Sequence, residues 1–128
     1  MNLSDLKLKF TIESPRGTYK KFADTLKEYP LLGVTFPTDY GYINGYVSED
    51  FHDLDVFIGS GKIHGILRVN REDVPGGIET KIILYVTEKE YTEIENAYKP
   101  VINELVKITE KNLVEYLKKF RDTRDQKH

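Results

Sequence analysis

Hydrophobic and polar residues alternate with a period of two near the start of the chain. Leu, Leu, Phe and Ile at positions 6, 8, 10 and 12 are separated by Lys, Lys and Thr, which predicts a half-buried strand over residues 6–12. Further apolar runs bounded by turn residues predict strands at 34–36, 42–47 (interrupted by Asn-Gly), 54–58, 63–69 and 81–86. Many short strands with frequent turns are typical of small β-barrels and sandwiches.

Helical patterning begins at Thr87. Thr87 and Glu90 form an S/T-x-x-E capping box, which predicts a helix start, and Pro100 predicts the end of that helix. Residues 104–108 fit a helix or a strand equally well. Thr109 can cap a final helix with one apolar stripe, made of Leu113, Leu117 and Phe120. No repeat, low-complexity segment or linker divides the chain, so residues 1–128 are expected to form a single domain, mainly β with C-terminal helices.

Composition narrows the class of protein. The chain has 128 residues, a net charge of -2 and no cysteine, which suits one domain without a disulfide scaffold or a Cys-ligated metal. Its mild acidity argues against nucleic acid as a partner. No apolar run approaches the roughly 20 residues of a membrane span, and the first residues lack the apolar core of a signal peptide. We therefore expect a cytoplasmic protein with neither nucleic-acid nor membrane partners.

An acidic segment is the first candidate for chemistry. Four carboxylates and one histidine fall within residues 49–55. Crowded like charges are costly unless solvent or a cation offsets them, and oxygen ligands without sulfur suit Mg²⁺ or Mn²⁺. If Asp53 and Asp55 begin a strand they share one face, and Asp50 can join them from the preceding turn. A solvated acidic loop explains the same composition, and spacing alone favours that interpretation.

A second polar group surrounds the turn at residues 75–77. Arg71, Glu72 and Asp73 precede the turn, whereas Glu79 and Lys81 follow it. A hairpin would bring Asp73 and Glu79 together, although spacing alone favours an ordinary charged hairpin tip. Two other segments also have simple explanations. The aromatic residues of 36–42 can fill the core, and the lysine of the pair at 98–99 can lie near the negative pole of a helix.

Taken in order, these segments resemble the soluble (family I) inorganic pyrophosphatases. Residues 12–17 (IESPRG), 36–43 (FPTDYGYI) and 49–56 (EDFHDLDV) are similar to the family's runs IEIP-x-G, YP-x-DYG-[FY]-I and D-G-D-P-[LV]-D. Residues 65–69 resemble its G-[VM]-L-[KR]-M strand, and Tyr98 and Lys99 resemble its late Tyr-Lys pair. The resemblance covers most of residues 8–120. It implies a small five-stranded, OB-like β-barrel with C-terminal helices, a homo-oligomer, and Mg²⁺-dependent hydrolysis of pyrophosphate to two phosphates, with Mn²⁺ as a second possible cofactor.

The same resemblance implies a role for individual residues. The implied metal ligands are Asp50, Asp55, Asp73, Glu79 and Glu13. The implied phosphate-binding residues are Lys21, Tyr40, Lys81, Tyr98 and Lys99. The implied catalytic residues are Asp53, His52 and Tyr40. Phosphoryl transfer requires mainly positioning and charge neutralisation, which carboxylate-held cations, lysines and tyrosines provide.

Several positions depart from the family pattern. His52 replaces the middle aspartate of D-G-D-P-L-D, and Asp53 replaces the proline that follows it, so either residue can substitute for the lost carboxylate. A histidine ligand would shift metal preference toward Mn²⁺, Co²⁺ or Zn²⁺. Phe36 replaces a tyrosine, Ala23 replaces an acid, and only Lys27 lies near the position of a family arginine. Residues 59–64 replace a longer segment. An enzyme with another phosphoanhydride or phosphate-ester substrate, or a non-catalytic binding homologue, is therefore the alternative to a pyrophosphatase.

Overall fold

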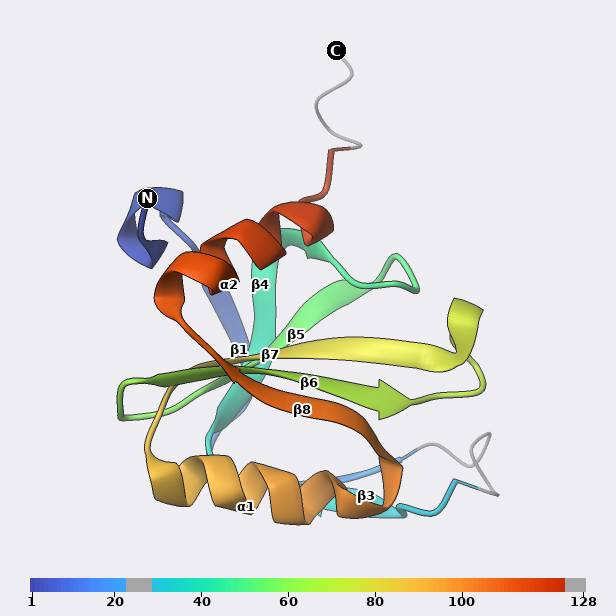
Figure 1. Ribbon diagram of the computed structural model, residues 1–128. Coiled ribbons are helices and arrows are strands. Elements are labelled where there is room, and N and C mark those ends of the chain that lie inside the picture. The colour runs from blue at the N-terminus through green and yellow to red at the C-terminus, as the bar shows by residue number, and fades with distance from the viewer. Residues whose placement is uncertain (23–28, 124–128) are drawn as a thin grey trace.

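The computed structural model describes residues 1–22 and 29–123 (Figure 1). A six-stranded sheet has the order β1-β4-β5-β7-β6-β8, and a two-stranded sheet joins β2 and β3. The strands are β1 Phe10–Ser14, β2 Tyr19–Lys21, β3 Gly33–Thr35, β4 Asp39–Val47, β5 Asp53–Ile58, β6 Ile63–Asn70, β7 Ile78–Val86 and β8 Ile102–Ile108. The α-helices are α1 Glu88–Tyr98 and α2 Glu110–Leu117. Short 3₁₀ turns occupy η1 Leu3–Leu6, η3 Pro75–Gly77, η4 Lys99–Val101 and η5 Lys118–Phe120.

The main sheet is open and mixed. Its neighbouring strands are antiparallel except for β5 and β7, which are parallel. Among the described residues β1 and β8 are the edges and do not pair with each other. The predicted class, mainly β with C-terminal helices, is confirmed, whereas the strand pairing differs from a closed five-stranded barrel. Within the same residues, no helix is both long and apolar enough to cross a membrane.

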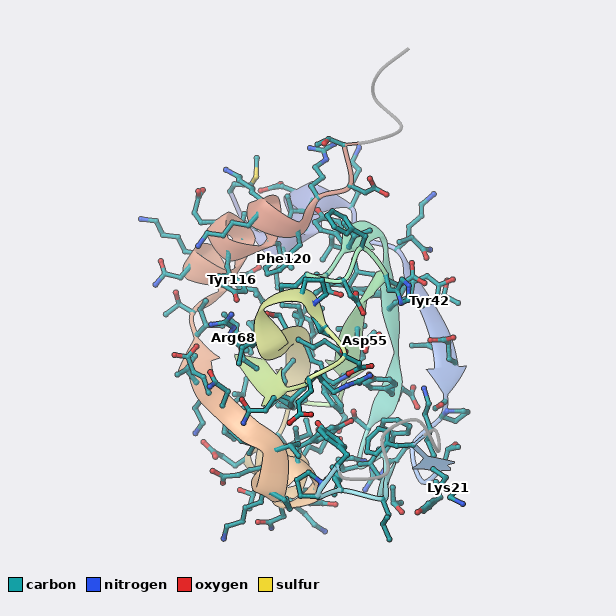
Figure 2. The ribbon with its side chains drawn as sticks, turned by 90° about the vertical axis from the view of Figure 1, so that its right-hand side faces the viewer. Lys21, Tyr42, Asp55, Arg68, Tyr116 and Phe120 are labelled. Carbon is teal, nitrogen blue, oxygen red and sulfur yellow. The ribbon has the colours of Figure 1, made fainter. Side chains whose placement is uncertain are left out.

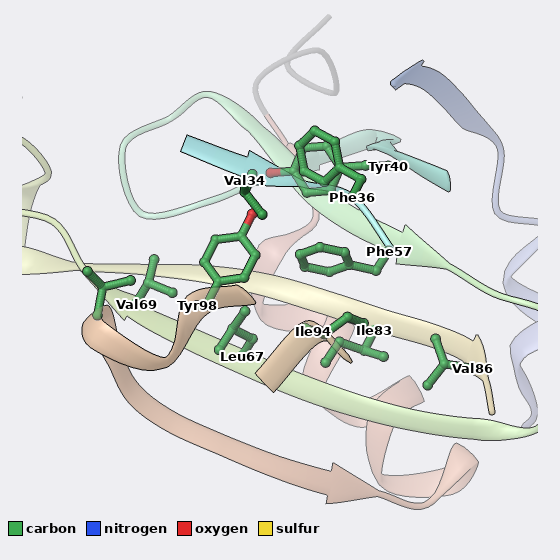
Figure 3. Close-up of a cluster of buried hydrophobic side chains, with 11 residues drawn as sticks. Val34, Phe36, Tyr40, Phe57, Leu67, Val69, Ile83, Val86, Ile94 and Tyr98 are labelled. Atoms are coloured by element: carbon green, nitrogen blue, oxygen red, sulfur yellow. The ribbon is translucent and has the colours of Figure 1, made fainter. Parts of the chain in front are cut away.

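Alternate residues of the central strands supply two hydrophobic cores. On β7, Ile82 and Leu84 pack with Leu113 of α2, whereas Ile83 packs with Ile94 of α1. Successive side chains of a strand point to opposite faces, so one helix covers each face of the sheet at its centre (Figure 1). The core on the α1 side is shown in Figure 3, with the rings of Phe36, Tyr40, Phe57 and Tyr98. Strands buried on both faces have nearly continuous apolar sequences, which explains the strength of the pattern at 81–86.

The predicted strands at 54–58 and 63–69 are confirmed as β5 and β6, and the apolar run at 81–86 is the C-terminal part of β7. The candidate at 42–47 belongs to a longer β4, whose register is irregular between Ile43 and Val47, where Gly45 has a φ of 82°. Residues 104–108, which fitted either element, form strand β8 against β6. Both helix caps are confirmed, because the hydroxyl oxygens of Thr87 and Thr109 each accept a backbone hydrogen bond.

The predicted strand over residues 6–12 is wrong in its first half. Asn2 and Asp5 form a capping box that starts the turn η1, and Lys7 ends it in the left-handed conformation, with a φ of 50°. The backbone N–H of Leu3 donates to Glu110 Oε1 at 2.8 Å, and the Leu3 side chain is buried against α2. Local capping and this tertiary contact therefore outweigh the alternation, and β1 begins only at Phe10.

His64 lies where the pairing of β6 with β7 is irregular, between Ile63 and Gly65. The backbone N–H of Tyr85 donates to His64 Nδ1 at 3.2 Å, and the two rings meet edge to face. Burial lowers the pKa of His64 and outweighs the opposing effect of Glu110. Lys62, Lys107 and Glu110 line the same surface hollow as His64. The native protein therefore favours the neutral imidazole.

We expect this imidazole to make the protein less stable in mild acid. A histidine in the unfolded chain is protonated below a pH of about 6.5. The folded state then binds fewer protons than the unfolded state, and the free energy of unfolding decreases as pH falls through that value. His64→Asn keeps a hydrogen-bond acceptor but does not titrate. Urea unfolding at pH 7.5 and 5.0 should show a smaller loss of free energy of unfolding for the variant than for the wild type. Equal losses in both proteins would refute the prediction.

Candidate active site

A cavity of about 480 Å³ lies on the α1 side of the main sheet. Its lining comes from strands β1, β2, β4, β5 and β7, from the loops before β5 and after β6, and from the end of α1. In Figure 2, Asp55 is labelled near the centre of the view and Lys21 below it. The fold therefore gathers polar residues from Glu13 to Tyr98 around one hollow.

All but one of the residues to which the resemblance gives a role line this cavity. They are Glu13, Lys21, Tyr40, Asp50, His52, Asp53, Asp55, Asp73, Glu79, Lys81 and Tyr98. Lys99 is the exception, since it is exposed in η4 and is not part of the lining. Ala23 and Lys27, which mark departures from the family pattern, lie outside the described residues.

Lys81 is at the centre of the cavity. Its buried ammonium donates to Tyr40 Oη at 2.7 Å, to Asp55 Oδ2 at 2.8 Å and to Glu79 Oε1 at 2.6 Å. The Tyr40 hydroxyl in turn donates to Asp55 Oδ2 at 2.6 Å. Strand pairing explains the convergence. Tyr40 lies two residues from Tyr42, which is opposite Asp55, so Tyr40 and Asp55 are on the same face. Val56 is opposite Ile82, so the residues before them, Asp55 and Lys81, are also side by side on that face.

Burial and charge set the protonation of this central group. Burial alone would lower the pKa of Lys81, but Asp55, Tyr40 and Glu79 together hold that pKa well above its ordinary value. Burial would raise the pKa of Asp55, yet the charge and hydrogen bond of Lys81 lower it overall. Burial raises the pKa of Tyr40 well above its usual value. At neutral pH the group therefore contains an ammonium, a carboxylate and a neutral phenol.

Arg71 extends this group into a chain of alternating charges. Its Nη1 lies 3.3 Å from Glu79 Oε2, and its Nη2 and Nε donate to the two Asp73 carboxylate oxygens at 2.7 and 2.9 Å. The chain therefore runs Asp55, Lys81, Glu79, Arg71, Asp73. The hairpin does bring Asp73 and Glu79 together, but through a shared arginine. The sequence placed Arg71 beside the hairpin turn without a role, and its position directly after the end of β6 was the available signal.

The acidic loop has a structural role as well as a place in the cavity. Asp50 Oδ1 accepts hydrogen bonds from Ser48 Oγ at 2.6 Å and from the His52 backbone N–H at 3.0 Å. Phe51 between them has a φ of 61°, which is rare for a bulky residue. The His52 side chain is 85% exposed, and its Nδ1 is 3.6 Å from Asp50 Oδ2. Asp50 therefore shapes the loop, and the imidazole extends largely into solvent.

Glu49 ties this loop to β7, a role the sequence did not suggest. Its two carboxylate oxygens accept from the Thr80 backbone N–H at 3.0 Å and from the Thr80 hydroxyl at 2.6 Å. Thr80 lies between Glu79 and Lys81, so the anchor sets the position of the loop relative to the central group.

Gly41 positions another part of the cavity wall, where β1 pairs with β4. A side chain there would collide with the carbonyl oxygen of Thr11, so glycine permits the close pairing of β1 with β4.

Two observations bear on the expected metal. Carboxylate oxygens are the ligand type that Mg²⁺ prefers, so the chemistry of the donors fits that ion. Within residues 1–22 and 29–123, however, no three His, Asp or Glu side chains are grouped as a metal centre. Asp55, Asp73 and Glu79 instead accept hydrogen bonds from Lys81 or Arg71. The donors therefore suit a divalent cation, but several of them are engaged by the protein's own cations.

The position where the resemblance expects a tyrosine is filled by Phe36. Its ring is buried and stacks on Tyr40 with centroids 4.2 Å apart (Figure 3). Phe36 therefore packs in the hydrophobic core through its contact with Tyr40, and it has no hydroxyl that could point into the cavity.

Fold and cavity together define an α+β protein whose open sheet carries a hollow lined by carboxylates, basic groups and phenols. A family model for inorganic pyrophosphatases matches residues 3–121, and the chain therefore belongs to the inorganic pyrophosphatase family. The matched segment runs from η1 through η5 and includes every residue of the cavity lining. No curated protein and no solved structure matches the chain.

Proposed function

We propose that the protein hydrolyses inorganic pyrophosphate to two phosphates with the help of a divalent cation, Mg²⁺ or Mn²⁺. The observation that carries this proposal is the convergence of the family-pattern residues on one cavity, with Lys81, Asp55 and Tyr40 hydrogen-bonded at its centre. A volume of about 480 Å³ is within the range of small-molecule sites. Membership of the pyrophosphatase family supports the same substrate.

In the proposed reaction, a water oxygen forms a bond to one phosphorus atom. The bond from that phosphorus to the bridging oxygen breaks, and the bridging oxygen keeps the electron pair as part of the second phosphate. One water proton passes to a base. Asp53 is an exposed carboxylate on the same strand face as Asp55, so we assign it this role, with His52 as the alternative. A bound divalent cation would neutralise phosphate oxygens and lower the pKa of water.

The remaining residues position the substrate and the cation. Lys21 and Tyr98 would donate hydrogen bonds to phosphate oxygens, whose charge increases as the bridge breaks. Lys81 would join them by giving up one of its three present acceptors. Burial raises the pKa of Tyr98 to about 12, so its phenol keeps its proton at neutral pH. We propose Asp50, Asp55 and Glu13 as ligands of the cation. Asp73 and Glu79 could join them only by giving up their contacts with Arg71. Lys99 would act only if its flexible side chain reached the cavity from η4.

A binding homologue without efficient turnover, or an enzyme with altered specificity, is the second candidate. It is favoured by one specific observation, the engagement of Asp55, Asp73 and Glu79 by Lys81 and Arg71. Carboxylates whose charge Lys81 or Arg71 already neutralises gain less from binding a metal ion. Such a protein would bind a phosphoanhydride in the cavity, and it would hydrolyse pyrophosphate slowly or cleave another phosphoanhydride faster.

Phosphate release from pyrophosphate tests the proposal. With Mg²⁺ or Mn²⁺ we expect turnover that falls at least about 100-fold when EDTA removes the cation, because charge neutralisation of this kind contributes about 3 kcal/mol or more. Tripolyphosphate and nucleoside triphosphates should be cleaved more slowly than pyrophosphate. Faster cleavage of any of these would favour altered specificity. Calorimetric binding of pyrophosphate without release would favour the binding homologue, and neither binding nor release would reject both.

A further inference from the structure

Arg71 is held in place from several directions. Its guanidinium makes a two-point contact with Asp73 and a further contact with Glu79. The guanidinium carbon lies 5.9 Å from the centre of the Tyr29 ring, within the range of a cation–π contact. The Arg71 backbone N–H donates to the Gly77 carbonyl oxygen at 2.8 Å, which ties the residue to the hairpin turn. The side chain is 20% exposed, so it is part of the cavity wall rather than a solvated surface group.

These contacts use most of the nearby carboxylate oxygens. Both oxygens of Asp73 accept from Arg71. Glu79 accepts from Lys81 through one oxygen and from Arg71 through the other. Arg71 keeps its proton because a guanidinium does not lose it in proteins, and Lys81 keeps its proton because Asp55, Tyr40 and Glu79 hold its pKa well above its ordinary value despite burial. A divalent ion that approached Asp73 and Glu79 would therefore compete with Arg71 for their oxygens and meet the repulsion of a fixed positive charge.

We propose that Arg71 is a resident cation of the cavity, which occupies the side formed by Asp73 and Glu79 and keeps a divalent ion away from these two carboxylates. The inference rests on the proposed function for one point only, that a divalent cation enters this cavity. Its consequence is that the wild-type chain holds fewer divalent ions, or holds them more weakly, than its set of carboxylates would allow.

Metal binding to Arg71 variants tests this inference without any substrate. Arg71→Gln removes the charge but can still donate a hydrogen bond, and Arg71→Met removes both. Titration with Mn²⁺, followed by calorimetry and by the electron paramagnetic resonance of free Mn²⁺, should show at least about tenfold tighter binding or one additional ion per chain for either variant. Arg71→Lys keeps the charge and should bind Mn²⁺ like the wild type.

Arg121→Met is the matched control for loss of a positive charge. Arg121 is an exposed arginine after η5, where its backbone pairs with Tyr46, and it does not line the cavity. Arg121→Met should leave Mn²⁺ binding unchanged. Urea unfolding identifies the variants that fold. If Arg71→Met does not fold, Arg71→Gln alone tests the inference. Unchanged or weaker Mn²⁺ binding in folded Arg71→Gln would overturn the inference, as would an equal gain in Arg121→Met.

Pyrophosphate hydrolysis, measured in parallel, separates this inference from the proposed function. A gain in Mn²⁺ binding without hydrolysis in any protein would support the resident cation and reject the pyrophosphatase. Hydrolysis by the wild type without a gain in the variants would support the enzyme and reject the role of Arg71.

Discussion

Replacing Asp55 with asparagine is expected to reduce phosphate release from pyrophosphate by at least about 100-fold, which corresponds to about 3 kcal/mol. Asp55 Oδ2 accepts hydrogen bonds from both Tyr40 and Lys81, so its carboxylate is the anionic centre of the cavity. An amide has nearly the same shape but carries no charge. It would therefore neither attract a divalent cation nor hold the Lys81 ammonium in the same way.

Glu104→Gln is the control for this substitution. Glu104 is an exposed carboxylate on the edge strand β8, away from the cavity lining, and its loss should leave the rate of hydrolysis unchanged. Urea unfolding shows whether Asp55→Asn remains folded at the assay temperature. Equal rates for folded Asp55→Asn and the wild type would contradict the central role of Asp55.

The second large effect is expected on stability. Lys81→Met should lower the free energy of unfolding by about 3–5 kcal/mol, the usual result of removing one partner from a buried ion pair. The Lys81 ammonium is bonded to Asp55, Glu79 and Tyr40, and only 7% of its side chain is exposed. Methionine fills much of the same volume, but it leaves two carboxylates without their shared counter-charge. Equilibrium urea unfolding measures the change.

A surface pair provides the comparison for Lys81. Lys107 Nζ and Glu88 Oε1 are 2.6 Å apart, but the two side chains are 49% and 70% exposed. Lys107→Met should therefore lower the free energy of unfolding by no more than about 1 kcal/mol. Combining Lys81→Met with Asp55→Asn should recover part of the loss, because the carboxylate bonded to Lys81 and Tyr40 is then neutral. A loss for Lys81→Met as small as that for Lys107→Met would show that the buried pair contributes little.

The parts of the fold that were predictable depend on near neighbours in the chain. The capping box of α1, the N-cap of α2 and the apolar runs of β5, β6 and β7 are local patterns, and the structure confirms them. Residues 104–108 were ambiguous because an edge strand has few apolar positions, and only pairing with β6 makes them a strand. The turn η1 was missed because it depends on Leu3 packing under α2, a contact between the two ends of the matched segment.

Most of the candidate site was predictable for a different reason. The resemblance to the pyrophosphatase family selected eleven residues that line the cavity, although not Lys20, Ser48 or Arg71, because a motif retains the identity of side chains even when their partners are unknown. Their partners were not predictable. A carboxylate such as Glu79 can face solvent, a metal ion or an ammonium, and the sequence contains no distance that distinguishes these environments. For the same reason, the sequence did not show that the His52 side chain is exposed or that Lys99 lies outside the cavity lining.

The sequence by itself therefore determined the mainly β class, the helix starts, the family resemblance and the set of residues available for chemistry. The tertiary structure alone decided the open six-stranded order, the parallel pairing of β5 with β7 and the ion-pair chain from Asp55 to Asp73. The physical reason is that capping and hydrophobic periodicity act over a few residues. The energy of a buried charge, in contrast, depends on which other charges strand order brings within about 3–4 Å.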